Sequence, residues 1–479
     1  MGRHLMIKEK RIDATGVLLQ NGHIVLPDRT YVGDLRIRDG IIAETGQLEP
    51  EKGERTLDCS GCHVLPGGIE THTHLQLESM GTVTADDFET GTRAALYGGT
   101  TTVLDFATQF HGESMAEGLD RWHQKAKNNC YIDYGFHMAL TEWNADLKSE
   151  MATIVEGGIS SFKIYMAYKN NMMLQEDEIY DALSETKRLG ATVGFHCENG
   201  LLIDVLVKEA KVSGNLSPWY HQWTRPPVFE EEAITRLETV NALLHADHYV
   251  VHLSTADGLN AILKARSSGN EVVAETCPQY LLLDNTRYGT ETSDDFEAAK
   301  YIMSPPLRDK SHQDHLWDGL ACGDIQFVGT DHCSFNYRGQ KEMGLGDFSK
   351  IPNGAPGIEL RLLLLYTYGV EKGRMDISRY SEVTSTNAAK YFGLYPKKGI
   401  LLPGSDADIV VLDPEPEWQV TSDLLHENCD YTPYEGFYMK GAVRDVFLRG
   451  RQKIASGKLV KDVRDGQYLR RGRPLKDIR

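Results

Sequence analysis

Short apolar segments alternate with helix-like segments through the central part of this chain, and this alternation constrains its fold most. A strand-like segment followed by a helix-like one predicts a parallel sheet with crossover helices, and eight such repeats favour a (β/α)₈ barrel of TIM type. The strand-like segments are Gly68–His72, Thr101–Phe106, Ile132–Leu140, Ser161–Tyr165, Thr192–His196, Tyr249–Leu253, Glu271–Thr276 and Gln326–Thr330. The helix-like segments between them include Asp86–Leu96, Glu176–Leu189, Glu230–Leu244 and Asp257–Ser267.

Both ends of the chain instead have the short apolar runs and turn signals that are typical of β structure. Residues 12–65 read as short strands and turns, including an Asn21-Gly22 hairpin signal, and similar runs return after Gly393. Because a short β segment is only marginally stable alone, we expect the two ends to pair into one small β-sandwich domain. The predicted division is 1–65 plus 396–479 for this domain and 66–395 for the barrel. The basic tail, 464–479, is either a disordered end or an arm onto a neighbouring subunit.

The charge and hydropathy of the chain exclude two classes of partner. Its 479 residues carry a formal net charge of -18, which argues against a nucleic-acid binder, since such a protein needs a basic face. No apolar run approaches the roughly 18 to 20 residues that span a bilayer, so we expect no membrane partner. The first sixteen residues lack the apolar core of a secretory signal, which predicts a cytoplasmic protein.

The eight cysteines are consistent with the predicted cytoplasmic location. Only Cys59 and Cys62 have the spacing of a redox or zinc pair. There is no second pair to complete a zinc site and no thioredoxin-like pattern around this one. Reduced thiols are therefore the simpler interpretation.

Two histidines one residue apart, His72 and His74, close the first predicted strand. Residues i and i+2 of a strand point to one face, so both imidazoles can meet one metal ion, although two exposed loop histidines would give the same pattern. Barrel enzymes place their chemistry at the carboxyl ends of the strands. Further metal-compatible residues occur on later strands or at their ends, namely Lys163, His196, His252 and Asp331.

Each of these residues also has an ordinary structural interpretation. His196 and His252 are compatible with packed core histidines, and Asp331 with a helix N-cap. Lys163 stands inside an apolar strand, where a buried ammonium is costly, so it either snorkels to the surface or is neutral or modified. Taken together, however, metal-compatible residues on five strands favour one shared site at the mouth of the barrel.

These residues resemble the cyclic amidohydrolases, specifically the dihydropyrimidinase and D-hydantoinase group. The resemblance covers nearly the whole chain, and the order and spacing of its motifs both fit. The motifs are PGGIETHTH, GGTTTVLDF, SSFKIYMAYKN, FHCENG, VVHLSTADG, ETCPQYLLLD, MSPPLRDK, GTDHCSF and PNGAPGIELR.

The resemblance implies a binuclear metal centre, most often of Zn²⁺, with Mn²⁺ or Co²⁺ as alternatives. By match, His72, His74 and Asp331 hold one ion, and His196 and His252 hold the second. Lys163 matches the family's N6-carboxylysine, which forms from CO₂ and bridges both ions. A carbamate would remove the problem of a buried ammonium, because it supplies an anionic oxygen ligand.

The resemblance also implies the reaction. A metal-bridging hydroxide opens the ring of a hydantoin or dihydropyrimidine to an N-carbamoyl amino acid. Asp331 matches the proton shuttle, and Tyr168 matches the phenol that stabilises the oxyanion. The main chain of Ser304 and the carbonyl of Asn353 match the groups that read the cyclic-amide substrate. The family is commonly tetrameric.

Some features depart from the family pattern or leave alternatives open. Glu70 stands where the family usually has Asp, and the segments Gln76–Asp86 and Tyr168–Leu174, which shape the pocket for the ring substituent, look atypical. Met172 and Met173 predict an adaptable apolar wall there. The alternatives are a sister amidohydrolase acting on allantoin or dihydroorotate, and a non-catalytic interaction homologue. All six ligand positions are filled, which disfavours the non-catalytic homologue.

Overall fold

The structure is a computed structural model that describes residues 16–293, 295–475 and 477–478. Eight strands pair in parallel as one sheet in the order β15-β14-β13-β12-β11-β10-β9-β6, which confirms the predicted barrel. The segment that follows β15 closes the barrel onto the end of β6 through a bridge between Thr73 and His332 and a 2.8 Å hydrogen bond from His74 N to His332 O. The barrel strands are β6 (Gly68–Thr73), β9 (Thr100–Thr108), β10 (Asp133–Ala139), β11 (Ser161–Tyr165), β12 (Thr192–His196), β13 (His248–Val250), β14 (Val272–Thr276) and β15 (Phe327–Val328).

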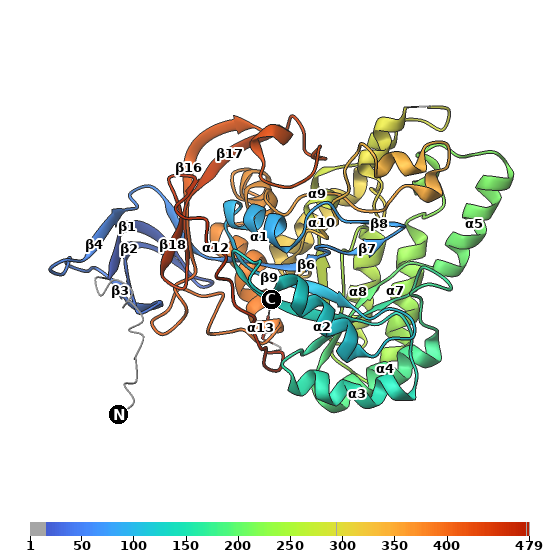
Figure 1. Cartoon of the computed structure of the whole chain (residues 1–479), viewed down its shortest axis with the longest axis horizontal. Coiled ribbons are helices and arrows are strands. Elements are labelled where there is room, and N and C mark those ends of the chain that lie inside the picture. Colours follow the sequence, from blue (N-terminus) through green and yellow to red (C-terminus); the bar gives the residue numbers. More distant parts are fainter. Residues whose placement is uncertain (1–15, 294, 476, 479) are drawn as a thin grey trace, which may run out of the picture.

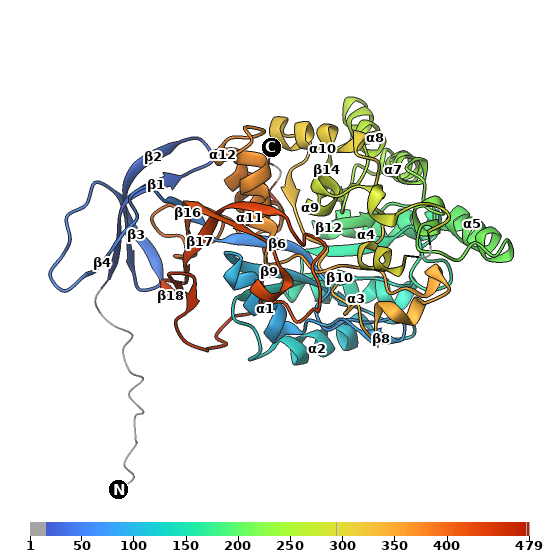
Figure 2. The ribbon, with the colours of Figure 1, turned by 90° about the horizontal axis from the view of Figure 1, so that it is seen from above.

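Helices surround the barrel strands (Figures 1 and 2). α4 shows why a helix forms where the sequence predicts one, because acidic residues fill its first turn, Lys187 and Arg188 lie in its last, and Gly190 ends it at a φ of 67°. The helices are α1 (Phe88–Tyr97), α2 (Met115–Ala126), α3 (Ala145–Glu156), α4 (Glu176–Leu189), α5 (Gly200–Val212), α6 (Tyr220–Trp223), α7 (Val228–Asn241), α8 (Ala256–Ser267), α9 (Pro278–Leu282), α10 (Ser311–Cys322), α11 (Arg361–Leu365), α12 (Ile377–Ser381) and α13 (Asn387–Tyr391).

The two ends of the chain build a second sheet, as predicted. Strand β5 pairs with β1 from the N-terminal end and antiparallel with β16 from the C-terminal end, so one ladder of hydrogen bonds joins both. Leu19 and Val64 share a buried core with Val411 and Phe447. The exact division at residues 65/66 and 395/396 stays a proposal. The strands are β1 (Val17–Val25), β2 (Thr30–Arg38), β3 (Ile41–Gly46), β4 (Arg55–Asp58), β5 (His63–Pro66), β16 (Ile409–Gln419), β17 (Tyr438–Leu448), β18 (Arg451–Ala455) and β19 (Lys458–Leu459).

Two barrel strands are shorter than the sequence predicts. β13 ends at Val250 rather than Leu253, and His252 beyond it adopts a φ of 41°, which breaks the extended conformation. β15 ends at Val328 rather than Thr330, because the Thr330 N–H donates to the side chain of Glu70 instead of a neighbouring strand. In both cases the strand stops shortly before a residue expected as a metal ligand, His252 or Asp331.

The described part of the C-terminal tail lies against the barrel of its own chain. Gln467 O accepts from Tyr134 N at 3.0 Å, and Leu469 N donates to Tyr134 O at 2.7 Å. Arg471 is buried and donates to Phe136 O. These contacts place the tail beside β10, while the prediction of an arm onto a neighbouring subunit stays untested.

The cysteines and the helices add two further observations. All eight cysteines are free. Cys62 Sγ lies 3.3 Å from Arg444 Nη1, and Cys62 belongs to the buried core of the second sheet. Burial raises the pKa of the Cys59 thiol to about 12.

Among the described residues, no helix combines the length and apolar character that a membrane crossing requires.

Candidate metal centre

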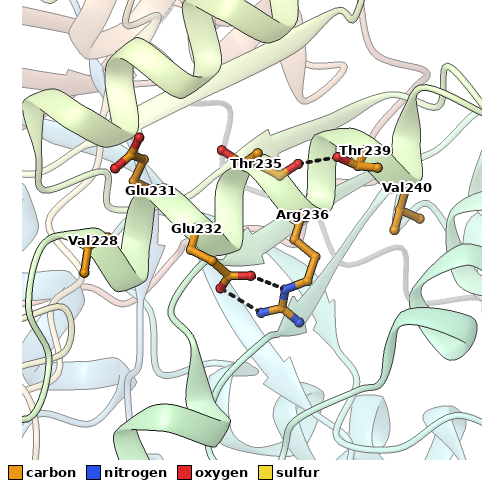
Figure 3. A pocket seen from close by; sticks show the side chains of 7 residues that line it. All are labelled: Val228, Glu231, Glu232, Thr235, Arg236, Thr239 and Val240. Carbon is orange, nitrogen blue, oxygen red and sulfur yellow. Dashed lines mark hydrogen bonds and ion pairs between the residues drawn. The ribbon is translucent and has the colours of Figure 1, made fainter.

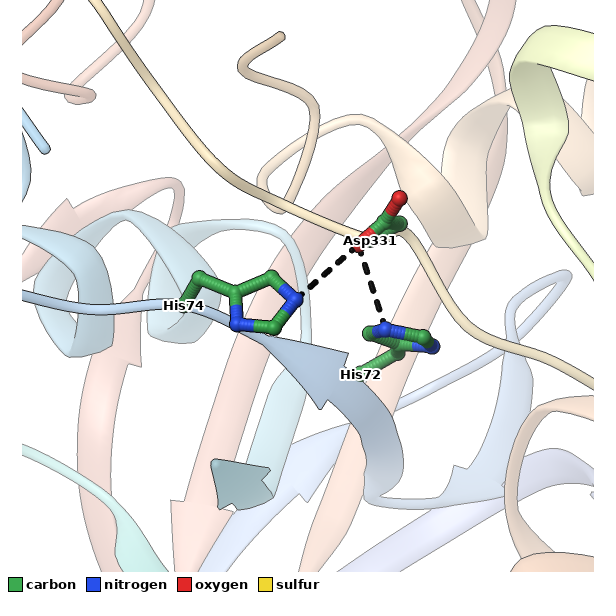
Figure 4. A group of neighbouring side chains, drawn as sticks. All are labelled: His72, His74 and Asp331. Atoms are coloured by element: carbon green, nitrogen blue, oxygen red, sulfur yellow. Dashed lines mark ion pairs between the residues drawn. The ribbon is translucent and has the colours of Figure 1, made fainter. Parts of the chain in front are cut away.

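His72, His74 and Asp331 converge at the point where the first and last barrel strands meet (Figure 4). Asp331 Oδ1 lies 3.1 Å from His72 Nε2 and 3.2 Å from His74 Nε2. The His72 side chain is fully buried, whereas those of His74 and Asp331 are 11% and 14% exposed. Burial lowers the pKa of His74 to about 4, so its imidazole is neutral and can bind a cation. The group therefore has two imidazoles and one carboxylate directed at one point.

Lys163 reaches the same group from β11. Its Nζ lies 3.1 Å from His72 Nε2 and 4.6 Å from the centre of the Phe106 ring. The side chain does not snorkel, since Lys163 is only 1% exposed. Burial lowers the pKa of Lys163 to about 8, which increases the neutral fraction of the amine near neutral pH.

His196 and His252 form a second pair beside the first group. His196 Nδ1 lies 2.9 Å from His252 Nε2, and the ring centres of His252 and His72 are 5.4 Å apart. His196 Nε2 lies 2.9 Å from Glu198 Oε2, and donation of its proton there leaves His196 Nδ1 as a lone-pair donor toward His252. All six residues expected as metal ligands thus gather at one end of the barrel.

Glu275, at the end of β14, is a site residue that the sequence analysis missed. Its Oε1 lies 2.6 Å from His72 Nδ1 and 3.3 Å from His252 N, and its Oε2 accepts from Thr71 Oγ1 at 2.6 Å. Donation from Nδ1 leaves His72 Nε2 free for a cation. The signal was a glutamate inside the apolar segment Glu271–Thr276, on the one late strand to which no site residue had been assigned.

Glu70 has a role that the sequence did not reveal. Its Oε1 accepts from His72 N at 2.8 Å and from Thr330 N at 2.9 Å, and its Oε2 lies 3.0 Å from Arg361 Nε. Glu70 and Arg361 are both fully buried. The carboxylate therefore joins the first barrel strand to the segment after the last, immediately behind the metal-compatible group.

Tyr168 and Ser304 lie on the same side of the barrel. The ring centres of Tyr168 and His196 are 5.1 Å apart, and Ser304 is among the groups close to the phenol. Burial, together with the nearby Glu198 carboxylate, raises the pKa of Tyr168, so the phenol keeps its proton. Ser304 is buried, whereas Asn353 is half-buried.

Three of these residues have an unusual backbone conformation. Tyr168, His252 and Asp331 adopt φ values of 68°, 41° and 53°. Positive φ is uncommon for residues other than glycine and costs about 1–3 kcal/mol where the surroundings enforce it. Such residues cluster at functional sites, and here each of them ends or follows a barrel strand.

Two other features are weaker candidates. Asp133, Asp406 and Asp408 form an acidic group, but Lys398 Nζ lies 2.8, 3.0 and 2.5 Å from their oxygens and already supplies the cation. A surface recess of about 500 Å³ follows the outer face of α7 (Figure 3) and is lined by one helix alone, where Arg236 pairs with Glu232. Its lining residues are Val228, Glu231, Glu232, Thr235, Arg236, Thr239 and Val240.

Comparison with known proteins gives the same picture as the geometry. The model of the amidohydrolase family matches residues 63–453. A D-hydantoinase of Geobacillus stearothermophilus is 44% identical over 457 residues, covering 95% of this chain and 96% of that protein. A D-phenylhydantoinase of Escherichia coli is 40% identical, covering 95% and 98%. The crystal structure of a dihydropyrimidinase from Brevibacillus agri superposes with a TM-score of 0.94 at 42% identity, covering 96% and 99%. The chain therefore belongs to the amidohydrolase family, in its group of D-hydantoinases and dihydropyrimidinases.

Proposed function

We propose that this protein is a metal-dependent hydrolase that opens the ring of hydantoins or dihydropyrimidines and yields N-carbamoyl amino acids. The observation that carries the proposal is the buried group in which Asp331 Oδ1 lies 3.1 Å and 3.2 Å from two imidazoles, with Lys163 Nζ 3.1 Å from one of them. The three relatives reported above are named D-hydantoinase, D-phenylhydantoinase and dihydropyrimidinase, which supports hydantoins or dihydropyrimidines as the substrate class.

The donor set fits two divalent cations, the centre that the family implies. We propose His72, His74 and Asp331 for one ion and His196 and His252 for the other, with Lys163 carboxylated by CO₂ and shared between them. Imidazole and carboxylate donors suit Zn²⁺, and Mn²⁺ or Co²⁺ would also be accepted. When bound, such ions polarise a carbonyl oxygen and lower the pKa of water toward about 7.

Two side chains would manage protons and charge during ring opening. Asp331 is partly exposed at the mouth of the barrel, and so can take a proton from water and return it to the leaving ring nitrogen. Tyr168 can donate a hydrogen bond to the oxyanion that develops on the attacked carbonyl, because its raised pKa keeps the phenol protonated.

The main chain of Ser304 and Asn353 is proposed to form hydrogen bonds with the C=O and N–H groups of the substrate ring. Within the described residues, no protein group is hydrogen-bonded to the main-chain N–H or C=O of either residue. Groups without a partner are costly when they are shielded from water, so they are suited to a ligand that presents alternating C=O and N–H groups. A cyclic imide or ureide has this pattern.

We further propose that the protein is a cytoplasmic homotetramer. Eight free cysteines fit a reducing compartment. The exposed apolar side chains on α5, including Leu202 and Val205, support an association surface on that helix.

A substrate panel tests the function. Dihydrouracil, hydantoin, 5-phenylhydantoin, allantoin and dihydroorotate would each be assayed with added Zn²⁺, Mn²⁺ or Co²⁺. We expect turnover of the first three and little of the last two. Turnover of allantoin or dihydroorotate alone would assign the protein to a sister activity, and no turnover with any metal would contradict the proposal.

A further inference from the structure

Lys341 is a fully buried lysine outside the metal-compatible group. It begins the 3-10 helix Lys341–Gly344, and its Nζ donates to Ile302 O at 2.9 Å, Pro352 O at 2.6 Å and Gly354 O at 2.7 Å. Among the described carboxylates, none forms an ion pair with it. An ammonium has three donors, and here each of them meets a main-chain carbonyl.

Burying the Lys341 ammonium costs free energy, and this cost is accounted for if its contacts hold other parts of the chain in position. Removing an ammonium from water costs several kcal/mol when no counter-charge accompanies it. A buried apolar side chain would fill the same space without that cost. The three acceptors come from two segments far apart in the sequence, and Gly354 N adds a 3.0 Å hydrogen bond to Ile302 O. Lys341 therefore fixes the separation of these two segments.

The two segments are those that carry the proposed ring-reading groups. Asn353 lies between two of the carbonyls that Lys341 binds, and Ser304 lies two residues after the third. Other buried donors occupy neighbouring carbonyls, since His221 Nε2 lies 2.7 Å from Met303 O and Tyr280 donates to Pro305 O at 2.8 Å. The carbonyls around Ser304 and Asn353 are thus held by the protein, while the main chain of these two residues is left for a ligand.

We infer that Lys341 is a positioning residue for substrate specificity: it sets the distance between the main chains of Ser304 and Asn353 so that both read one cyclic-amide ring. The inference rests on the proposed function and extends it to a residue that touches neither the substrate nor the metal-compatible group. A purely structural lysine would stabilise the fold without affecting which ring is preferred.

The test compares the wild type with Lys341→Met, which removes the charge, and Lys341→Arg, which keeps it but cannot match three carbonyls with one compact ammonium. The control is Lys350→Met, because Lys350 lies nearby in sequence but its side chain is 68% exposed. KM and kcat are measured for hydantoin and for 3-methylhydantoin, which lacks the N–H between the two carbonyls. Metal content per subunit and Tm are measured for every variant.

For both Lys341 variants we expect KM for hydantoin to rise about tenfold, equivalent to about 1.4 kcal/mol. We expect kcat to change less than about threefold, because the reacting groups are undisturbed. The preference for hydantoin over 3-methylhydantoin should fall, whereas metal content and the control variant should match the wild type.

Several outcomes would overturn the inference. An unchanged KM in a folded variant would do so, as would an equal loss of kcat/KM on both substrates, which indicates a general structural defect. Failure of both variants to fold would assign Lys341 to the fold rather than to specificity. If the wild type itself hydrolyses neither substrate nor dihydrouracil, the proposed function fails, and the inference fails with it.

Discussion

Asp331 is proposed both as a metal ligand and as the proton shuttle, and its replacement separates these two roles. Asp331→Asn keeps the size of the side chain but removes its ability to take a proton. We expect a folded protein whose kcat falls by about 10²–10⁴, the usual contribution of a general acid–base group. Circular dichroism and metal analysis check the fold and the site. Near-normal turnover in this variant would contradict the proton-shuttle role.

Tyr168 gives a residue-level prediction with a defined pH dependence. Because the pKa of the phenol is raised, it remains a hydrogen-bond donor through the neutral and mildly alkaline range. Tyr168→Phe should therefore lower kcat by about 10²–10³, and by the same factor at pH 7 and pH 9. Parallel pH–rate profiles check this. A loss that disappears at pH 9 would mean that the phenol ionises below that pH.

Single residues also show where sequence reasoning stops. His72, Lys163 and Asp331 could be predicted because each lies on or directly after a recognisable strand. Glu275 also lies on a predicted strand, but its partner His72 is distant in the sequence, and Lys341 binds main-chain carbonyls, so neither contact leaves a pattern in side-chain type. Contacts to the backbone are invisible until the fold is known.

At the scale of elements, Glu70 links β6 to the segment that follows β15. Glu70→Gln would leave the buried Arg361 without a counter-charge, and breaking such a pair costs about 3–5 kcal/mol of stability. Glu70→Asp keeps the charge on a shorter side chain, so we expect a smaller loss of about 1–2 kcal/mol. Urea unfolding compares the two with Glu89→Gln, which removes an exposed ion pair to Arg464. Equal stability of Glu70→Gln and Glu89→Gln would contradict this role.

The elements themselves were predicted unevenly, for physical reasons. α4 matches its prediction at both bounds, since its caps and charged turns are local signals. β13 and β15 were predicted too long, because the apolar run continues while the backbone turns toward the site. Elements whose ends depend on tertiary contacts are those that local sequence describes least well.

At the scale of the whole molecule, the second sheet and α5 lie at opposite ends (Figures 1 and 2). The sheet depends on both chain ends, and this long-range pairing was predicted only from the short apolar runs and turn signals at each end. α5 directly follows the segment of His196 and Glu198, and Gly200 N donates to Met166 O at 3.2 Å. A surface on α5 is therefore connected through few residues to the metal-compatible group.

The exposed apolar side chains of α5 predict that the proposed homotetramer associates through this helix. Leu202 and Val205 are 46% and 48% exposed, and burying them against a second copy would remove apolar surface from water. We expect the double variant Leu202→Glu, Val205→Glu to lower the molar mass measured by light scattering, because four new carboxylates would meet at each symmetric contact. The control is Leu424→Glu, a side chain 57% exposed beside the second sheet, which should leave the mass unchanged. A double variant that keeps the wild-type mass would place the association surface elsewhere.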